Sequence, residues 1–180
     1  RQGDASPPLT PQVIWHIILI YPFLAHRRID KRGLSMNIYF AGAIRGGRQD
    51  AARYRQIISL LKEYGDVLTE HVGYEDPAQA ESNVSDEEIY NRDMSWLEEA
   101  DILVAEVTVP SHGVGYEIAR AEFLEKAILC LYRPDAAQRL SALIAGNSHV
   151  RCEEYEHLGQ LGSILEAFLP DRAGYPDGSS

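Results

Sequence analysis

Basic residues, cysteine and long apolar runs are all scarce in this sequence of 180 residues. Lys and Arg total 17 against 27 Asp and Glu, which gives a formal net charge of -10. A nucleic-acid polymer or an anionic membrane would need a basic surplus to neutralise its phosphates, so neither is expected as the main partner. A small anionic ligand remains compatible with this charge, because a few arginines and backbone amides are enough to bind it.

The two cysteines, Cys130 and Cys152, lie in separate apolar runs and do not form a C-x-x-C pair. The sequence therefore gives no sign of a zinc or redox motif, and two inert buried thiols are expected. Free thiols fit a reducing compartment, so we expect a cytoplasmic protein. No cluster of metal-ligating residues is evident, and we expect neither a metal nor a cofactor.

The apolar run at residues 13–25 is too short to cross a bilayer, and Pro22 interrupts it. Basic residues follow this run rather than precede it, which argues against a signal peptide. The first methionine is Met36, where a strong strand pattern begins. We expect residues 1–35 to be a leader outside the fold, with a membrane-surface or partner-binding arm as the alternative. The Pro/Gly/Ser-rich residues 170–180 are expected to be a flexible tail.

Residues 36–169 alternate between strand-like and helix-like runs, which predicts one α/β domain. Strands are expected at 37–43, 67–72, 101–107, 127–132 and 149–152, and helices at 50–64, 85–100, 116–126, 140–145 and 158–169. Because the strands are almost entirely apolar, the pattern predicts a Rossmann-like three-layer sandwich around a central, mostly parallel five-stranded sheet. Ser85 and Glu88 have the spacing of a capping box, and Gly65 is expected to be the C-cap of the first helix.

Polar residues gather where the predicted strands end. The carboxyl ends of parallel strands share one edge of a sheet, and ligands bind there near the switch point. Residues 42–47 follow the first strand, 69–71 end the second and 106–108 end the third. The turn at 42–47 lacks the G-x-G-x-x-G spacing, and we find no acidic partner for a ribose after the second strand. A dinucleotide is therefore not expected.

The stretch S-H-G-V-G-Y-E at residues 111–117 joins the third strand to a helix. Gly113 and Gly115 allow a tight turn with outward N–H groups, which at a helix N-terminus suit an anion. Glu117 would repel a phosphate bound there, which makes sense if the phosphate is a handle and the carboxylate reacts nearby. The alternative is that Glu117 only favours the helix dipole and that the glycines serve close packing. His112 could contact the phosphate or face solvent, and the sequence does not decide between the two.

Seven motifs follow one another along the chain: YFAGAIRGGR at 39–48, VLTEHV at 67–72, Asp93 before Trp96-Leu97, VAEVT at 104–108, GVGYE at 113–117, ILCLYRP at 128–134 and LSA at 140–142. In this order they resemble the 2'-deoxynucleoside 5'-monophosphate N-hydrolases, which are relatives of the nucleoside 2-deoxyribosyltransferases. The resemblance covers about residues 36–155.

The resemblance implies hydrolysis of the N-glycosidic bond of a 2'-deoxynucleoside 5'-monophosphate, which gives a free base and 2-deoxyribose 5-phosphate. It implies that Glu117 is the nucleophile at C1', that Asp93 is the general acid and that Tyr39 orients Glu117. The substrate-binding residues that it implies are Arg45 with its neighbours Gly42, Ile44 and Gly46, then His71 at the base, and Ser111, Gly113 and Ser141 at the phosphate. Ser141 would come from the other subunit of a homodimer.

The residue types fit this chemistry in their own right. An oxocarbenium-like transition state suits two carboxylates, one that attacks or stabilises C1' and one that protonates the leaving base. For that role Asp93 would have to keep its proton, which burial could favour. Arg48 competes with Arg45 for the phosphate.

Three other functions remain open. A ribonucleotide hydrolase, such as one that acts on CMP, is the nearest, because the sequence does not show how the 2'-position is recognised. A transferase to a second base fits less well, since a free nucleoside has no phosphate to hold. A non-catalytic nucleotide sensor also fits less well, because paired carboxylates beside an anion weaken binding unless chemistry follows.

Overall fold

The computed structural model describes residues 36–44, 50–74, 83–134 and 139–169, all within the unit Met36–Ser180. The predicted leader at 1–35 and tail at 170–180 lie outside the described residues. The elements are β1 (Met36–Ala41), α2 (Ala51–Leu61), β2 (Gly65–Val67), the 3-10 helix η3 (Glu70–Gly73), α4 (Asp86–Glu99), β3 (Ile102–Glu106), α5 (His112–Phe123), β4 (Ala127–Tyr132), α6 (Ala142–Ala145), β5 (Val150–Glu154), the 3-10 helix η4 (Leu158–Gln160) and α7 (Leu161–Phe168).

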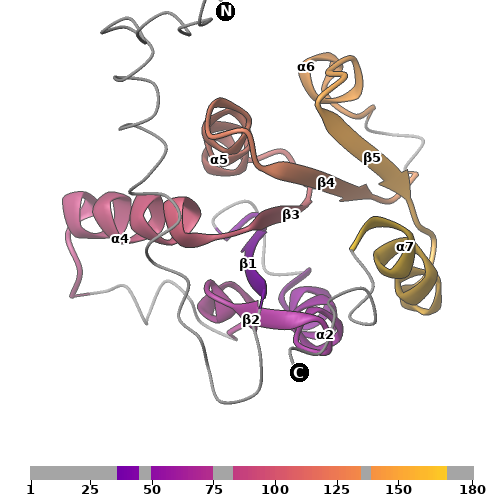
Figure 1. Ribbon diagram of the computed structural model, residues 1–180, viewed down its shortest axis with the longest axis horizontal. Helices are drawn as coiled ribbons and strands as arrows, with labels where there is room; N and C mark the ends of the chain where they lie inside the picture. The colour runs from indigo at the N-terminus through magenta and orange to yellow at the C-terminus, as the bar shows by residue number, and fades with distance from the viewer. Residues whose placement is uncertain (1–35, 45–49, 75–82, 135–138, 170–180) are drawn as a thin grey trace, which may run out of the picture. The chain divides into compact units, whose positions relative to one another are not determined.

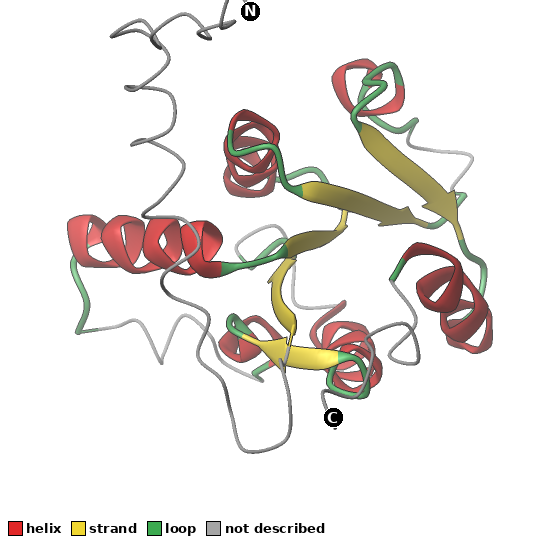
Figure 2. Ribbon diagram, viewed as in Figure 1, coloured by secondary structure: helices red, strands yellow, loops and turns green. Residues whose placement is uncertain are grey.

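The strands form one five-stranded sheet in the order β2-β1-β3-β4-β5, and every pair is parallel. Helices cover both faces of the sheet, with α4 and α5 on one side and α2 and α7 on the other (Figures 1 and 2). This confirms the predicted three-layer α/β fold. The strand order reverses between β1 and β3, so a ligand is expected outside the carboxyl ends of these two strands.

Alternation along β1 divides the core between the two faces of the sheet. Ile38 and Phe40 pack with α2 and α7, and the Phe40 ring meets Tyr54 of α2 edge-on at 5.7 Å. Tyr39 and Ala41 belong to the second apolar cluster, with α4 and α5. Because successive side chains of a strand point to opposite faces, the polar end of Tyr39 faces α5 rather than α2.

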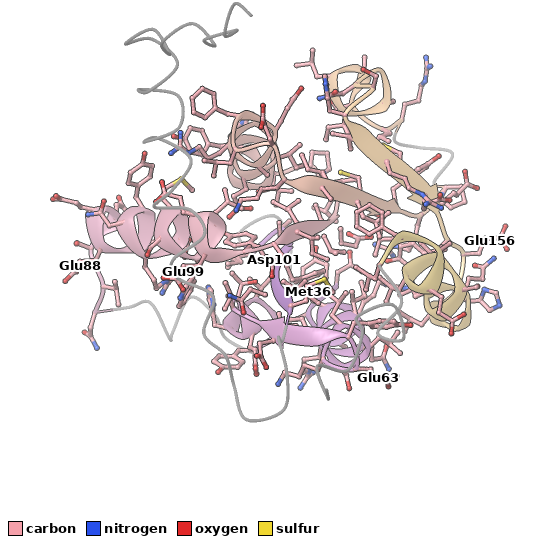
Figure 3. The ribbon with its side chains drawn as sticks, in the orientation of Figure 1. Met36, Glu63, Glu88, Glu99, Asp101 and Glu156 are labelled. Atoms are coloured by element: carbon pink, nitrogen blue, oxygen red, sulfur yellow. The ribbon has the colours of Figure 1, made fainter. Side chains whose placement is uncertain are left out.

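The helix α4 begins with the capping box that the sequence predicts. Glu88 Oε2 accepts from Ser85 N at 2.9 Å, and Glu88 N donates to Ser85 Oγ at 3.2 Å. Figure 3 shows Glu88 at the start of α4 and Glu99 near its end. Directly after α4, the Asp101 carboxylate accepts a 2.9 Å hydrogen bond from Asn37 N, beside Met36. This bond ties the end of α4 to the start of β1.

The predicted second strand was wrong in both bounds, because β2 is Gly65–Val67 rather than 67–72 and residues 70–73 form η3. A threonine side chain takes over the pairing of β1 at this point. Thr69 Oγ1 donates to Phe40 O at 2.7 Å and accepts from Phe40 N at 2.9 Å. The backbone of residues 70–73 therefore does not have to pair with β1 and forms η3 instead, in which Val72 is still buried.

The role predicted for Gly65 was also wrong. The helix α2 ends at Leu61 with Lys62 as its C-cap, and Gly65 already belongs to β2. A Cβ atom on Gly65 would lie 2.1 Å from the carbonyl oxygen of Met36. Glycine is therefore needed here because β2 approaches β1 closely.

Within the described ranges, we find no helix that combines the length and the apolar character needed to span a membrane.

Candidate active site

The centre of the candidate site is a contact between β1 and α5. The Tyr39 hydroxyl donates a 2.8 Å hydrogen bond to Glu117 Oε1. Tyr39 is buried in the sheet, whereas Glu117 is half-buried on the face of α5 that turns toward β1. The pair joins two of the three residues that the sequence predicted to be catalytic.

Burial is the main reason that the pKa of Glu117 is raised to about 7. The hydrogen bond from Tyr39 opposes this rise, and the charge of Asp93 adds to it. Burial, together with Glu117 and Asp93, also raises the pKa of Tyr39, so its hydroxyl keeps its proton and acts as the donor. A carboxyl with a pKa near 7 changes its charge in the range where most enzymes work.

Asp93 lies on α4 and is the third predicted catalytic residue. Arg92 Nε and Nη2 both lie 2.9 Å from Asp93 Oδ1. Arg92 Nη2 also lies 3.3 Å from His71 Nε2, which brings the residue predicted to line the base pocket next to the predicted acid. Since Asp93 acts electrostatically on both Tyr39 and Glu117, these four predicted residues share one region.

Arg92 and Trp96 complete this region, although the sequence predicted no site role for either residue. The Arg92 guanidinium lies 4.9 Å from the centre of the Trp96 ring, and the rings of His71 and Trp96 are 5.5 Å apart. Arg92 and Trp96 are four residues apart on one helix, so their spacing indicates that they share a face of α4. That spacing was a signal in the sequence, and the aromatic and cationic groups together suit a flat polar base.

The start of α5 holds two of the predicted phosphate ligands. Ser111 is the N-cap, and its Oγ accepts from Val114 N at 3.5 Å. The helix starts at His112, four residues earlier than predicted, because Gly113 and Gly115 adopt helical backbone instead of breaking the helix. Among the described residues, a Cβ on Gly113 would meet only Ser111 Oγ at 3.8 Å, and one on Gly115 would meet no atom within 4 Å. Packing within this part of the chain therefore requires neither glycine.

The predicted residues after β1 are only partly described. Arg45 and Gly46, like the competing Arg48, lie outside the described residues. Gly42 is buried, and a Cβ there would lie 3.0 Å from the Tyr54 ring, so close packing accounts for this glycine. Ile44 is half-buried and packs against both apolar clusters.

Ser141 and His112 are both exposed. Ser141 is the N-cap of α6, which packs beside β5, and the strand order places β3 and β4 between β5 and β1. The arrangement within one chain therefore does not bring Ser141 to Tyr39 and Glu117. His112 is the first residue of α5, beside the predicted phosphate turn.

Comparison with known proteins gives three results. A family model described as nucleoside 2-deoxyribosyltransferase matches residues 38–163. A 5-hydroxymethyl-dUMP N-hydrolase from Danio rerio is 53% identical over 138 residues, which are 74% of this chain and 96% of that protein. The protein of the same name from Homo sapiens is 44% identical over 142 residues, which are 73% of this chain and 78% of that protein.

Among solved structures, the CMP N-glycosidase of Clostridium botulinum superposes with a TM-score of 0.55 at 23% identity. The match covers 74% of this chain and 99% of that chain, and it shows that the two proteins share a fold. The family model and the two N-hydrolases extend the agreement from the fold to the sequence. This chain therefore belongs to the nucleoside 2-deoxyribosyltransferase family.

Proposed function

We propose that this protein hydrolyses the N-glycosidic bond of 2'-deoxynucleoside 5'-monophosphates, giving a free base and 2-deoxyribose 5-phosphate. The observation that carries the proposal is the Tyr39–Glu117 hydrogen bond of 2.8 Å, with Asp93 close enough to shift the pKa of both residues. Its relatives with 44–53% identity are N-hydrolases of a deoxynucleoside monophosphate. The chain is accordingly an N-glycosyl hydrolase.

In the first step, the ionised Glu117 attacks C1' of the sugar. The bond from C1' to the base nitrogen breaks, and its electron pair leaves with the base, which takes a proton from Asp93. The product of this step is an ester between the sugar and Glu117. The burial of Glu117 favours attack, because a poorly solvated carboxylate loses less hydration when it forms a covalent bond.

In the second step, a water molecule attacks C1' and loses a proton to the Asp93 carboxylate. The bond from C1' to the Glu117 oxygen breaks and restores the ionised Glu117, while Asp93 ends the cycle protonated. The hydrogen bond that Tyr39 donates to Glu117 is strong when Glu117 is a carboxylate and weaker when the ester has formed, because an ester oxygen is a poorer acceptor. Tyr39 thus holds Glu117 in the geometry of attack.

Ser111 and Gly113 are the described candidates for holding the 5'-phosphate. The first N–H groups of a helix have no partner within the helix, and they point toward an anion placed at its N-terminus. Arg45, which lies outside the described residues, is proposed to add a cation to the same phosphate.

A homodimer forms the second part of the proposal. Large apolar side chains stand exposed on α4, α5 and α6, namely those of Tyr90 (52%), Tyr116 (53%), Phe123 (75%) and Leu143 (87%). Such a surface suits a second copy of the chain, and Ser141 lies two residues from Leu143. In a dimer that forms through this face, Ser141 of one subunit could contact the active site of the other subunit. In sedimentation equilibrium, Leu143→Glu should yield monomers, whereas Ser163→Glu on α7 should not.

The first test is to follow base release from a panel of deoxy- and ribonucleoside monophosphates and free nucleosides. Release only from 5'-phosphorylated deoxynucleosides, with 5-hydroxymethyl-dUMP among them, supports the proposal. Preferential release from CMP would instead indicate a ribonucleotide hydrolase, and transfer of the sugar to an added base would indicate a transferase. Binding without release from any of these compounds would overturn the proposed activity in favour of a sensor.

Variants of the two carboxylates complete this test. Glu117→Gln should lower kcat by about 1,000-fold or more while substrate still binds, because the nucleophile is lost but its volume is kept. Asp93→Asn should lower kcat most for bases that are poor leaving groups. Equal losses for good and poor leaving groups would contradict the role of Asp93 as the general acid.

A further inference from the structure

A carboxylate that the proposed mechanism does not use lies at the end of β3. Glu106 has no exposed surface. Because side chains alternate along a strand, Glu106 shares the face of Val104, which packs with α2 and α7, whereas Tyr39 and Glu117 meet on the other face. The carboxylate is therefore separated from the proposed chemistry by the sheet.

The contacts of Thr108 fix the direction of the hydrogen bonds around Glu106. Thr108 Oγ1 forms a short hydrogen bond with Glu106 Oε1, and Thr108 N lies 3.3 Å from Glu106 Oε2. The backbone N–H of Arg133 donates to Thr108 Oγ1 at 2.9 Å. Since an N–H group can only donate, the hydroxyl of Thr108 accepts from Arg133 and gives its own proton to Glu106.

Two further side chains contact the same carboxylate. The Tyr155 hydroxyl donates to Glu106 Oε1 at 2.9 Å, and Arg133 Nε lies 3.6 Å from the same oxygen. Arg133 Nη2 donates to Asp50 Oδ2 at 2.7 Å, and Asp50 is a buried residue directly before α2. One arginine thus joins the ends of β3 and β4 to the start of α2.

Stability alone does not account for such a cluster, because apolar residues of similar volume often stabilise a fold as well as a buried ion pair does. What the cluster defines is the position of Thr108. This residue begins the loop to Ser111, the N-cap of α5. The contact of Glu106 with Thr108 therefore determines where the chain begins its path toward the proposed phosphate turn.

We propose that Glu106 is a positioning residue for phosphate recognition, and that it acts through Thr108 on the turn that carries Ser111 and Gly113. The inference rests on the proposed function, in which this turn holds the 5'-phosphate of the substrate. Glu117 is fixed separately, by its bond to Tyr39 and by the buried Val114 and Ile118 of α5. Loss of the Glu106–Thr108 contact should therefore weaken phosphate binding more than it slows the chemistry.

The test compares three variants that leave Glu117, Asp93 and Ser111 in place. Thr108→Val removes the hydroxyl but keeps the shape, and Thr108→Ser keeps the hydroxyl. Tyr155→Phe removes a hydrogen bond from the same carboxylate but does not touch the turn. We expect Thr108→Val to raise KM about tenfold, with kcat changed by less than about threefold, and to raise the inhibition constant of inorganic phosphate in parallel. Thr108→Ser and Tyr155→Phe should keep the wild-type KM.

Thermal unfolding of all three variants separates positioning from stability. Tyr155→Phe removes one hydrogen bond to Glu106, whereas Thr108→Val removes one to Glu106 and also the acceptor of the Arg133 N–H group. A fall in Tm in both variants with a rise of KM in Thr108→Val alone supports the inference. A KM of Thr108→Val equal to that of Thr108→Ser would overturn it, as would an equal rise of KM in Tyr155→Phe. Absence of base release by the wild-type protein would overturn the proposed function itself, and this inference with it.

Discussion

The hydroxyl of Tyr39 and the carboxylate of Glu117 meet at 2.8 Å, although 78 residues separate them in the sequence. Tyr39 reaches α5 because it alternates with Ile38 and Phe40, which pack on the opposite face of β1. Glu117 reaches β1 because α5 starts at His112, which places Glu117 in the second turn of the helix. The contact thus depends on strand register and helix start together, and small changes in either would break it.

Replacement of Tyr39 by Phe should shift the acid limb of kcat/KM to higher pH. In the wild-type protein, this limb is expected near pH 7, because the pKa of Glu117 is about 7 and only the ionised form attacks. The hydrogen bond from Tyr39 lowers that pKa, so its loss raises the pKa by roughly one unit. We also expect kcat to fall by about 10- to 100-fold through poorer orientation of Glu117. A pH profile with an unmoved acid limb would contradict the assignment of Glu117 as the ionised nucleophile.

The raised pKa of Glu117 also predicts how stability depends on pH. A carboxyl with a pKa of 4.5 when unfolded and about 7 when folded binds its proton more tightly in the folded state. Folding is then favoured below pH 4.5, and this advantage is lost as the pH rises toward 7 and above. Glu117→Gln has no charge to bury. Between pH 4.5 and pH 8, the difference in free energy of unfolding between this variant and the wild-type protein should therefore shift in favour of the variant by about 1 to 3 kcal/mol.

Urea unfolding at pH 4.5 and pH 8 measures this prediction without any assay of activity. Glu63→Gln, at an exposed position on the loop after α2, is the control for the substitution itself. A free energy difference between wild type and Glu117→Gln that is the same at both pH values would mean that Glu117 is ionised at little cost in the folded protein.

Glycine at residue 65 is predicted to be essential for the pairing of β2 with β1. A Cβ there would lie 2.1 Å from Met36 O, which forces the two strands apart. Gly65→Ala should therefore destabilise the protein by about 2 kcal/mol or more. Gly162→Ala on α7 is the control, because a Cβ there meets no atom within 4 Å and should stabilise the helix by roughly 0.5 to 1 kcal/mol. A Gly65→Ala variant with wild-type stability would show that β2 can move.

The sequence predicted the fold well because its signals there are local. The apolar run at residues 127–132 became β4 with the expected bounds, and Ser85 with Glu88 forms the expected capping box. Failures arose where distant segments decide the structure. The second strand ends early because Thr69 bonds to Phe40, a residue 29 positions away that no local pattern reveals.

In the candidate site too, some residues could be predicted from the sequence and others only from the fold. The motif around Glu117 could be read from the sequence together with the resemblance, and the fold brings this residue to Tyr39 as expected. Arg92 carried no motif, and its spacing from Trp96 indicated only that the two residues share a face of α4. Its contact with His71 depends on η3, which brings His71 to α4. The buried carboxylate of Glu106 was noted in the sequence as one more polar residue at a strand end. Its distant partners come from the segments directly after β4 and β5, so that only the folded chain assembles them.

The ion pair between Arg92 and Asp93 should limit how readily the base is protonated. A guanidinium 2.9 Å from Asp93 Oδ1 favours the ionised carboxylate, whereas the proposed general acid must be protonated. Arg92→Gln removes this cation, so kcat for bases that are poor leaving groups should rise relative to kcat for good leaving groups. Arg92→Lys keeps the charge and should leave this ratio near its wild-type value. If the ratio stayed the same in Arg92→Gln while KM rose, Arg92 would instead serve to bind the base beside Trp96 and His71.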